Sequence, residues 1–163
     1  MSNRSTPDEY ESDGKQLQSG SLHEQCVMPP KPTYEIDGRR FATLEAFYDE
    51  ISQVLIPEAD WGRNLDAFND ILRGGFGTPD GGFVLRWVNS DVSRHRLGYP
   101  ETVRQLELRL QRCHPSNRQS VARDLEEARR GEGPTVFDWL LDIIRVHTAD
   151  GREEEDGVEL ALA

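Results

Sequence analysis

Acidic side chains recur at helical spacing in segment 64–74. If this segment is a helix, Asp66 and Asp70 lie on one face with Arg73, and Asn69 lies beside them. Asp66 falls in the first turn, where the helix dipole stabilises a negative charge. Asp70 lies in the second half, repels Asp66, and belongs to a residue type that disfavours helix interiors. A residue that lowers local stability in this way is a candidate for a binding site.

The charge of the surrounding chain suits a cationic partner. Residues 44–70 contain seven acidic side chains and one basic side chain. Such a patch would attract a basic protein and speed its association, although charge alone favours a solvated surface. The whole chain of 163 residues carries a net charge of -11. This balance disfavours general binding to nucleic acids or anionic membranes, because both depend on lysine and arginine.

The elements that position these side chains follow from apolar periodicity and from turn residues. Two expected helix starts have capping residues, Thr43 and Asn64, and Pro57 and Gly74-Gly75 end the two helices that follow them. The expected elements, in order, are strand 34–37, a helix after Thr43, helix 65–73, strand 83–88, helices 101–113, 116–130 and 136–146, and strand 158–163. Strands joined by helical crossovers indicate an α/β fold with a small parallel sheet covered by helices.

Each expected helix has a stripe for burial. In the acidic segment, Leu65, Phe68 and Leu72 share the face opposite the aspartates. In helices 101–113 and 116–130, the apolar stripes are Val103, Leu106, Leu110 and Cys113, then Val121, Leu125 and Ala128. The polar residues of 136–146 recur at spacings of four and three, which predicts a largely buried helix rather than a strand.

Composition divides the chain into a leader and one domain. Residues 1–33 are rich in Ser, Pro, Glu and Gln and predict a disordered leader before a domain at 34–163. We expect no signal peptide and no membrane span. The two cysteines match no metal spacing, so we expect free thiols and a cytoplasmic location.

Other chemistry has weaker support. The four histidines are scattered without metal-ligand spacing, Cys113-His114 diverge on a helix end, and 74–77 lacks the lysine of a phosphate loop. We therefore expect neither an enzyme nor a cofactor or metal site. The acidic run 153–156 is best interpreted as a solubilising loop within 149–157. Segment 94–130 has nine arginines against five acids, which leaves an RNA-associated regulator as an alternative.

The acidic segment and its preceding loop also resemble a known family. The barstar signature has an aromatic-Gly pair, a variable residue, Asn-Leu-Asp-Ala, an apolar residue, a variable residue and Asp. The matching positions here are Trp61-Gly62, Arg63, Asn64-Leu65-Asp66-Ala67, Phe68, Asn69 and Asp70. The order of strands and helices over about 34–100 and 134–163 is similar as well.

This resemblance implies a three-stranded parallel sheet flanked by helices, and a protein that inhibits small secreted ribonucleases. In the family, carboxylates of the helix and of the loop before it take the place of substrate phosphate in a basic cleft. Carried over by position, that contact falls to Asp66 and Asp70, with Asp60 in the loop, Gly74 at the helix end and Asp142 as an outlying acidic contact. An immunity-type role would follow.

The chain also departs from the family pattern. Asn69 and Gly75 stand where aromatic contacts are expected, and Arg73 places a positive charge on the face that should meet a basic enzyme. Segment 97–133 is a helical insertion that the compact family form lacks. These differences favour, as the second hypothesis before an RNA-associated regulator, an interaction module of the same fold that binds another basic protein without inhibiting a nuclease.

Overall fold

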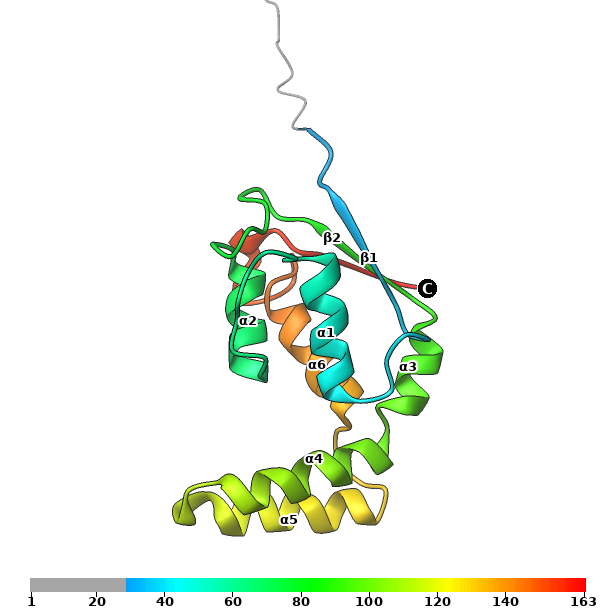
Figure 1. Ribbon diagram of the computed structural model, residues 1–163, viewed down its shortest axis with the longest axis vertical. Helices are drawn as coiled ribbons and strands as arrows, with labels where there is room; N and C mark the ends of the chain where they lie inside the picture. The colour runs from blue at the N-terminus through cyan, green and yellow to red at the C-terminus, as the bar shows by residue number, and fades with distance from the viewer. Residues whose placement is uncertain (1–28) are drawn as a thin grey trace, which may run out of the picture.

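The protein is built from one parallel sheet with helices packed against it. The computed structural model describes residues 29–163, so the expected leader up to residue 28 lies outside the described residues. The elements are β1 (Thr33–Asp37), α1 (Leu44–Val54), α2 (Leu65–Arg73), β2 (Val84–Val88), α3 (Ser90–Arg96), α4 (Tyr99–Arg112), η1 (Pro115–Asn117), α5 (Arg118–Arg129), α6 (Val136–Val146), η2 (Glu154–Asp156) and β3 (Glu159–Leu162). Figure 1 shows their arrangement.

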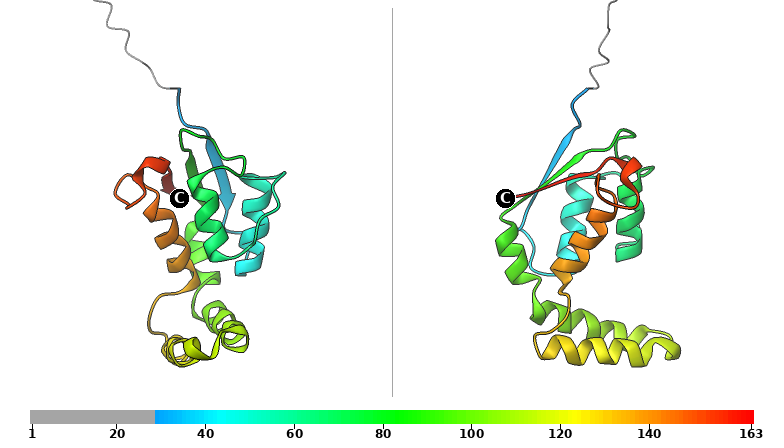
Figure 2. Two further views of the ribbon diagram at one scale, coloured as in Figure 1. Left: turned by 90° about the vertical axis from the view of Figure 1, so that its left-hand side faces the viewer. Right: turned by 180° about the vertical axis from the view of Figure 1, so that it is seen from behind.

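The three strands confirm the predicted parallel sheet. Their order is β1-β2-β3, and both neighbouring pairs are parallel. In the register, Ile36 lies opposite Trp87, and both side chains are fully buried. The alternate residues face solvent, where Glu35 pairs with Arg86 at 3.6 Å. One face of the sheet therefore carries the core, and α1, α2 and α6 lie on that side of the sheet (Figure 2).

The main core forms where α1, α2 and α6 meet the sheet. Phe47 of α1 stacks on Trp87 and makes an edge contact with Phe68 of α2. Phe137 of α6 packs on Trp87 from another side, with ring centroids 5.2 Å apart. These aromatic pairs join α2, α1, β2 and α6 in one core, and α2 and α6 also contact each other directly. The core thereby positions the acidic segment relative to the C-terminal third of the chain.

Most predicted elements are confirmed, with shifts at their ends. The first strand begins at Thr33, one residue before the expected start, and α4 and α5 begin two residues away from the expected positions. Helix α3 was not predicted, because its sequence has no apolar stripe and buries only Ser93. Within residues 29–163, no helix is long and apolar enough to cross a membrane.

The expected insertion is a helical hairpin with a small core of its own. Leu106 of α4 packs with Val121, Leu125 and Ala128 of α5, as their predicted stripes require. The hairpin lies below the main body in Figure 1, and its tip extends toward the side that carries α2. Trp139 of α6 contacts both cores and joins the hairpin to the body.

Candidate protein-binding site

Helix α2 is short but firmly placed. The Asn64 side chain accepts a hydrogen bond of 2.8 Å from the Ala67 backbone N–H, which confirms the predicted cap. Phe68, Ile71 and Leu72 are buried, so the opposite face of the helix is turned to solvent. That face is therefore displayed on a rigid support.

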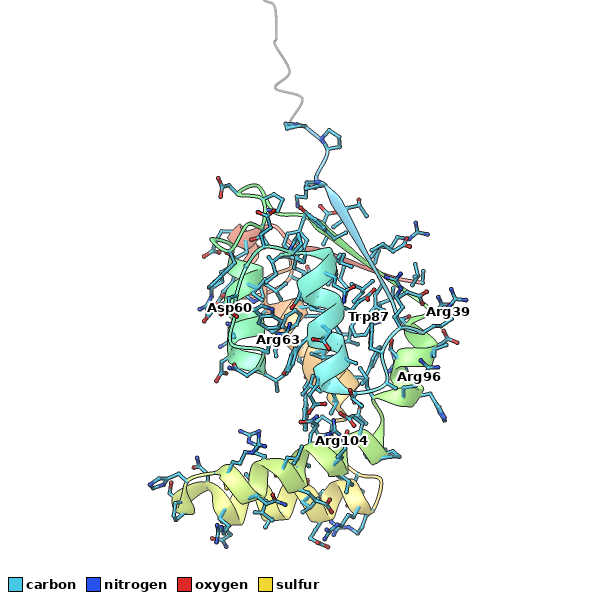
Figure 3. The ribbon with its side chains drawn as sticks, in the orientation of Figure 1. Arg39, Asp60, Arg63, Trp87, Arg96 and Arg104 are labelled. Carbon is cyan, nitrogen blue, oxygen red and sulfur yellow. The ribbon has the colours of Figure 1, made fainter. Side chains whose placement is uncertain are left out.

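The loop before α2 is held by contacts with α1. The indole N–H of Trp61 donates to Ser52 Oγ at 2.7 Å, and the buried Trp61 ring makes an edge contact with Tyr48. Arg63 has a φ of +46°, which is uncommon for a residue with a side chain, and it pairs with Asp49 at 2.6 Å. Figure 3 shows Asp60 and Arg63 along this loop beside α2.

The three candidate aspartates on this surface are all exposed. Asp66 and Asp60 form no salt bridge with any residue between 29 and 163, whereas Asp70 lies 3.3 Å from Arg73. Burial raises the pKa of the Tyr48 hydroxyl, and the negative charges of Glu45 and Asp66 raise it further. Tyr48 therefore stays protonated and adds no negative charge beside Asp66.

The sequence predicted that Arg73 places an unpaired positive charge on this face, but the structure pairs Arg73 with carboxylates. Its guanidinium group binds both carboxylate oxygens of Glu153 at 2.6 and 2.5 Å and also contacts Asp70. The hydrogen bonds with Glu153 raise the pKa of Arg73, and those from Arg73 lower the pKa of Glu153. The acidic run 153–156, predicted only to solubilise a loop, therefore neutralises the arginine on the candidate binding face.

Asn69 of α2 is also held by a residue from the C-terminal part of the chain. His147 is fully buried at the end of α6, with one ring nitrogen 2.9 Å from Asn69 Oδ1 and the other 2.6 Å from Asp156 Oδ2. Asn69 thus contacts the body of the protein, and its contact with a partner remains a prediction. Sequence reasoning missed His147, Glu153 and Asp156, because no local pattern indicates contacts between residues about 80 positions apart.

The geometry of this cluster disfavours a metal ion. One ligand atom each of His147, Glu153 and Asp156 lie within 4.8 Å of one another. However, Arg73 occupies both oxygens of Glu153, and a cation beside a guanidinium group would be repelled. The cluster instead links α2 to the C-terminal loop as a closed network of hydrogen bonds and ion pairs.

The two remaining candidates lie at the margins of this surface. Gly74 ends α2 as predicted, with a φ of +104° that residues with side chains rarely adopt. Asp142 is exposed on α6 and lies 3.6 Å from Arg145 of the same helix. The structure therefore brings Asp66, Asn69, Asp70, Arg73 and Gly74 together on α2, with Asp60 in the adjoining loop, while Asp142 lies on a different helix.

The comparison with family models agrees with this architecture. The family model described as Barstar (barnase inhibitor) matches residues 32–137, which is more than half of the chain and runs through the hairpin. Among curated proteins, no significant match is found. The strand β3 lies beyond the matched range, and the structure shows that it completes the three-stranded sheet. By this match and this fold, the chain belongs to the barstar family of inhibitors.

Proposed function

We propose that this protein inhibits a small basic ribonuclease by inserting the exposed face of α2 into the active-site cleft of the enzyme. The observation that carries the proposal is the pair Asp66 and Asp70, exposed on a helix whose other face is locked in the core. Carboxylates held in this way take the place of substrate phosphates and pair with the cationic groups of the enzyme. The function is binding rather than catalysis.

Rigidity favours tight binding by this surface. The cap at Asn64, the pairing of Arg63 with Asp49 and the buried Trp61 fix the loop and the helix before a partner arrives. Ordering of a flexible interface would cost about 0.5–1.5 kcal/mol for each immobilised side chain. A preformed surface avoids much of that cost, so more of the charge attraction appears as affinity.

The electrostatic balance of the face also favours a basic partner. Arg73 is compensated by Glu153, so it does not oppose the approach of cationic groups as the sequence alone suggested. An immunity-type role in the cytoplasm, where the inhibitor would protect cellular RNA, is part of this proposal.

The proposal is tested by titrating the protein into barnase and a panel of other small basic microbial ribonucleases. We expect inhibition of at least one enzyme, and a loss of affinity in the isosteric variants Asp66→Asn and Asp70→Asn. Removing one partner of a buried interfacial charge pair costs about 2–5 kcal/mol, a range that includes complexes of this family, so each variant should weaken inhibition at least about 30-fold.

The matched control is Asp91→Asn, because Asp91 is an exposed aspartate on α3. Its inhibition constant should stay within about twofold of the wild-type value. Equal inhibition by the α2 variants and the wild-type protein would refute the site. Failure of the wild-type protein to inhibit any ribonuclease of the panel would refute the function and favour a module that binds another basic protein.

A further inference from the structure

The hairpin of α4 and α5 is fixed at its root. The Glu101 carboxylate, which is 6 % exposed, accepts a hydrogen bond of 2.9 Å from the Leu44 backbone N–H of α1. Thr102 Oγ1 accepts another, also of 2.9 Å, from the Val136 N–H at the start of α6. Arg104 forms ion pairs with both Glu45 and Glu101. These contacts join the hairpin to two helices of the body, so its distance from α2 is set by the fold.

A cleft of about 670 Å³ separates the hairpin from the body. One wall, formed by α1 and the start of α2, contains Glu45, Arg63 and Asp66. Glu45 is paired with Arg104 and Arg63 with Asp49, so among the residues that the structure describes Asp66 carries the unpaired charge of this wall. The other wall, the outer part of α4, contains Arg109 and Arg112. Apolar atoms line the space between them, contributed by Leu65, Leu108 and Trp139. The cleft therefore has one wall with the unpaired carboxylate of Asp66, an opposite wall with two arginines, and apolar side chains between them.

The two arginines of the basic wall differ from Arg104 and Arg129 of the same hairpin. Arg104 and Arg129 each pair with two carboxylates. Arg109 and Arg112 are exposed and form no salt bridge with any residue that the structure describes. Their charges are thus available to a partner that enters the cleft.

We propose that this cleft is a second docking site for the same ribonuclease, and that it binds a segment with acidic side chains next to an apolar side. The acidic groups would pair with Arg109 and Arg112, and the apolar side would cover Leu108 and Trp139. This inference rests on the proposed function, because Asp66 belongs both to the exposed face of α2 and to the cleft. The hairpin then selects, among basic nucleases, those with an acidic patch beside the active site.

Charge complementarity favours a protein segment over RNA. A phosphate chain entering the cleft would meet the unpaired carboxylate of Asp66 on the wall opposite the arginines. A protein segment can place a basic side toward that wall and an acidic side toward Arg109 and Arg112. The opposite signs of the two walls therefore fit a partner that itself carries both signs.

The test is the double variant Arg109→Glu/Arg112→Glu, measured by inhibition of the ribonuclease that the wild-type protein inhibits best. The matched control combines Arg123→Glu on α5 with Arg130→Glu directly after α5, which changes the net charge equally outside the cleft. Added negative charge at a distance should accelerate association with a basic enzyme. The proposal predicts the opposite for the cleft variant: inhibition about tenfold weaker than that of the control.

The possible results separate the two proposals. Weaker inhibition by the cleft variant, with a smaller effect in the same direction for Arg109→Gln/Arg112→Gln, supports the docking site. Equal or stronger inhibition compared with the control overturns the docking site while the proposed function stands. Absence of inhibition by the wild-type protein overturns both. Binding of a fluorescent single-stranded RNA that the cleft variant alone loses would overturn the docking site in favour of a nucleic-acid site.

Discussion

Replacement of Glu101 by glutamine tests how the hairpin is held against the body. The carboxylate accepts hydrogen bonds from the Leu44 N–H, from the Gln105 amide and twice from the Arg104 guanidinium, at distances of 2.7–2.9 Å. Glu101→Gln keeps the size of the side chain but removes the charge, and it places an amide N–H2 against a guanidinium N–H. A charge-assisted hydrogen bond lost in a buried site costs about 1.5–3 kcal/mol, so we expect the free energy of unfolding to fall by roughly 2–3 kcal/mol.

The stability lost in Glu101→Gln should be larger at neutral pH than at acidic pH. Burial by itself raises the pKa of Glu101, but the hydrogen bonds from Arg104, Gln105 and Leu44 outweigh burial, so the pKa is lowered overall. A carboxyl group with a lowered pKa stabilises the folded state above its unfolded pKa of about 4.3, and this contribution is lost as the pH falls through the folded pKa. The difference in the free energy of unfolding between wild type and variant should therefore be largest at pH 7 and should become smaller below about pH 4.3.

Urea unfolding followed by tryptophan fluorescence at several pH values between about 2.5 and 7 measures both the free energy of unfolding and its dependence on pH. The control is Glu107→Gln on the same helix, because Glu107 is half exposed and pairs with Arg129 at the surface. The free energy of unfolding of the control variant should fall by less than about 1 kcal/mol. A loss for Glu101→Gln as small as that of the control, or a difference that stays constant with pH, would refute this account of the hairpin root.

Two further predictions concern α2. Asn64→Ala removes the cap of a nine-residue helix, so the free energy of unfolding should fall by about 1 kcal/mol in urea titrations and inhibition should weaken, whereas an unchanged midpoint would contradict the role of the cap. His147→Leu leaves Asn69 and Asp156 without their buried partner, so the free energy of unfolding should fall by about 2–3 kcal/mol. A stable His147→Leu variant with full inhibition would show that the network does not support α2.

The fold could be predicted where local signals agree. Thr43, Asn64 and Gly74 mark helix ends by their own hydrogen bonding and backbone conformation, and the apolar stripes between them have a clear period. Helix α3 has no such signal. It is held instead by distant contacts, because Ser93 accepts a hydrogen bond of 2.9 Å from the Trp87 indole and lies where a side chain on Gly38 would collide with it.

The candidate site could be predicted only in part, for a related reason. The spacing of Asp66 and Asp70 shows which face they share, because four residues make about one helical turn. The charge of that face depends on Glu153, which binds Arg73 from 80 positions away, and no pattern within either segment indicates this pair. The two walls of the cleft could not be predicted from the sequence either, because their positions depend on the direction in which the hairpin leaves the body.

The contacts between α2 and the C-terminal loop determine when, during synthesis, the protein can first present α2 for binding. Asn69 and Arg73 are held by residues between 147 and 156, and β3 completes the sheet only after them. A ribosome adds about 5–20 residues each second, so the roughly 90 residues between α2 and the end of β3 take on the order of 5–20 s to synthesise. During that interval, the nascent chain carries the acidic helix without the contacts that orient it, and a messenger truncated before the codon for His147 would yield a protein that lacks them permanently.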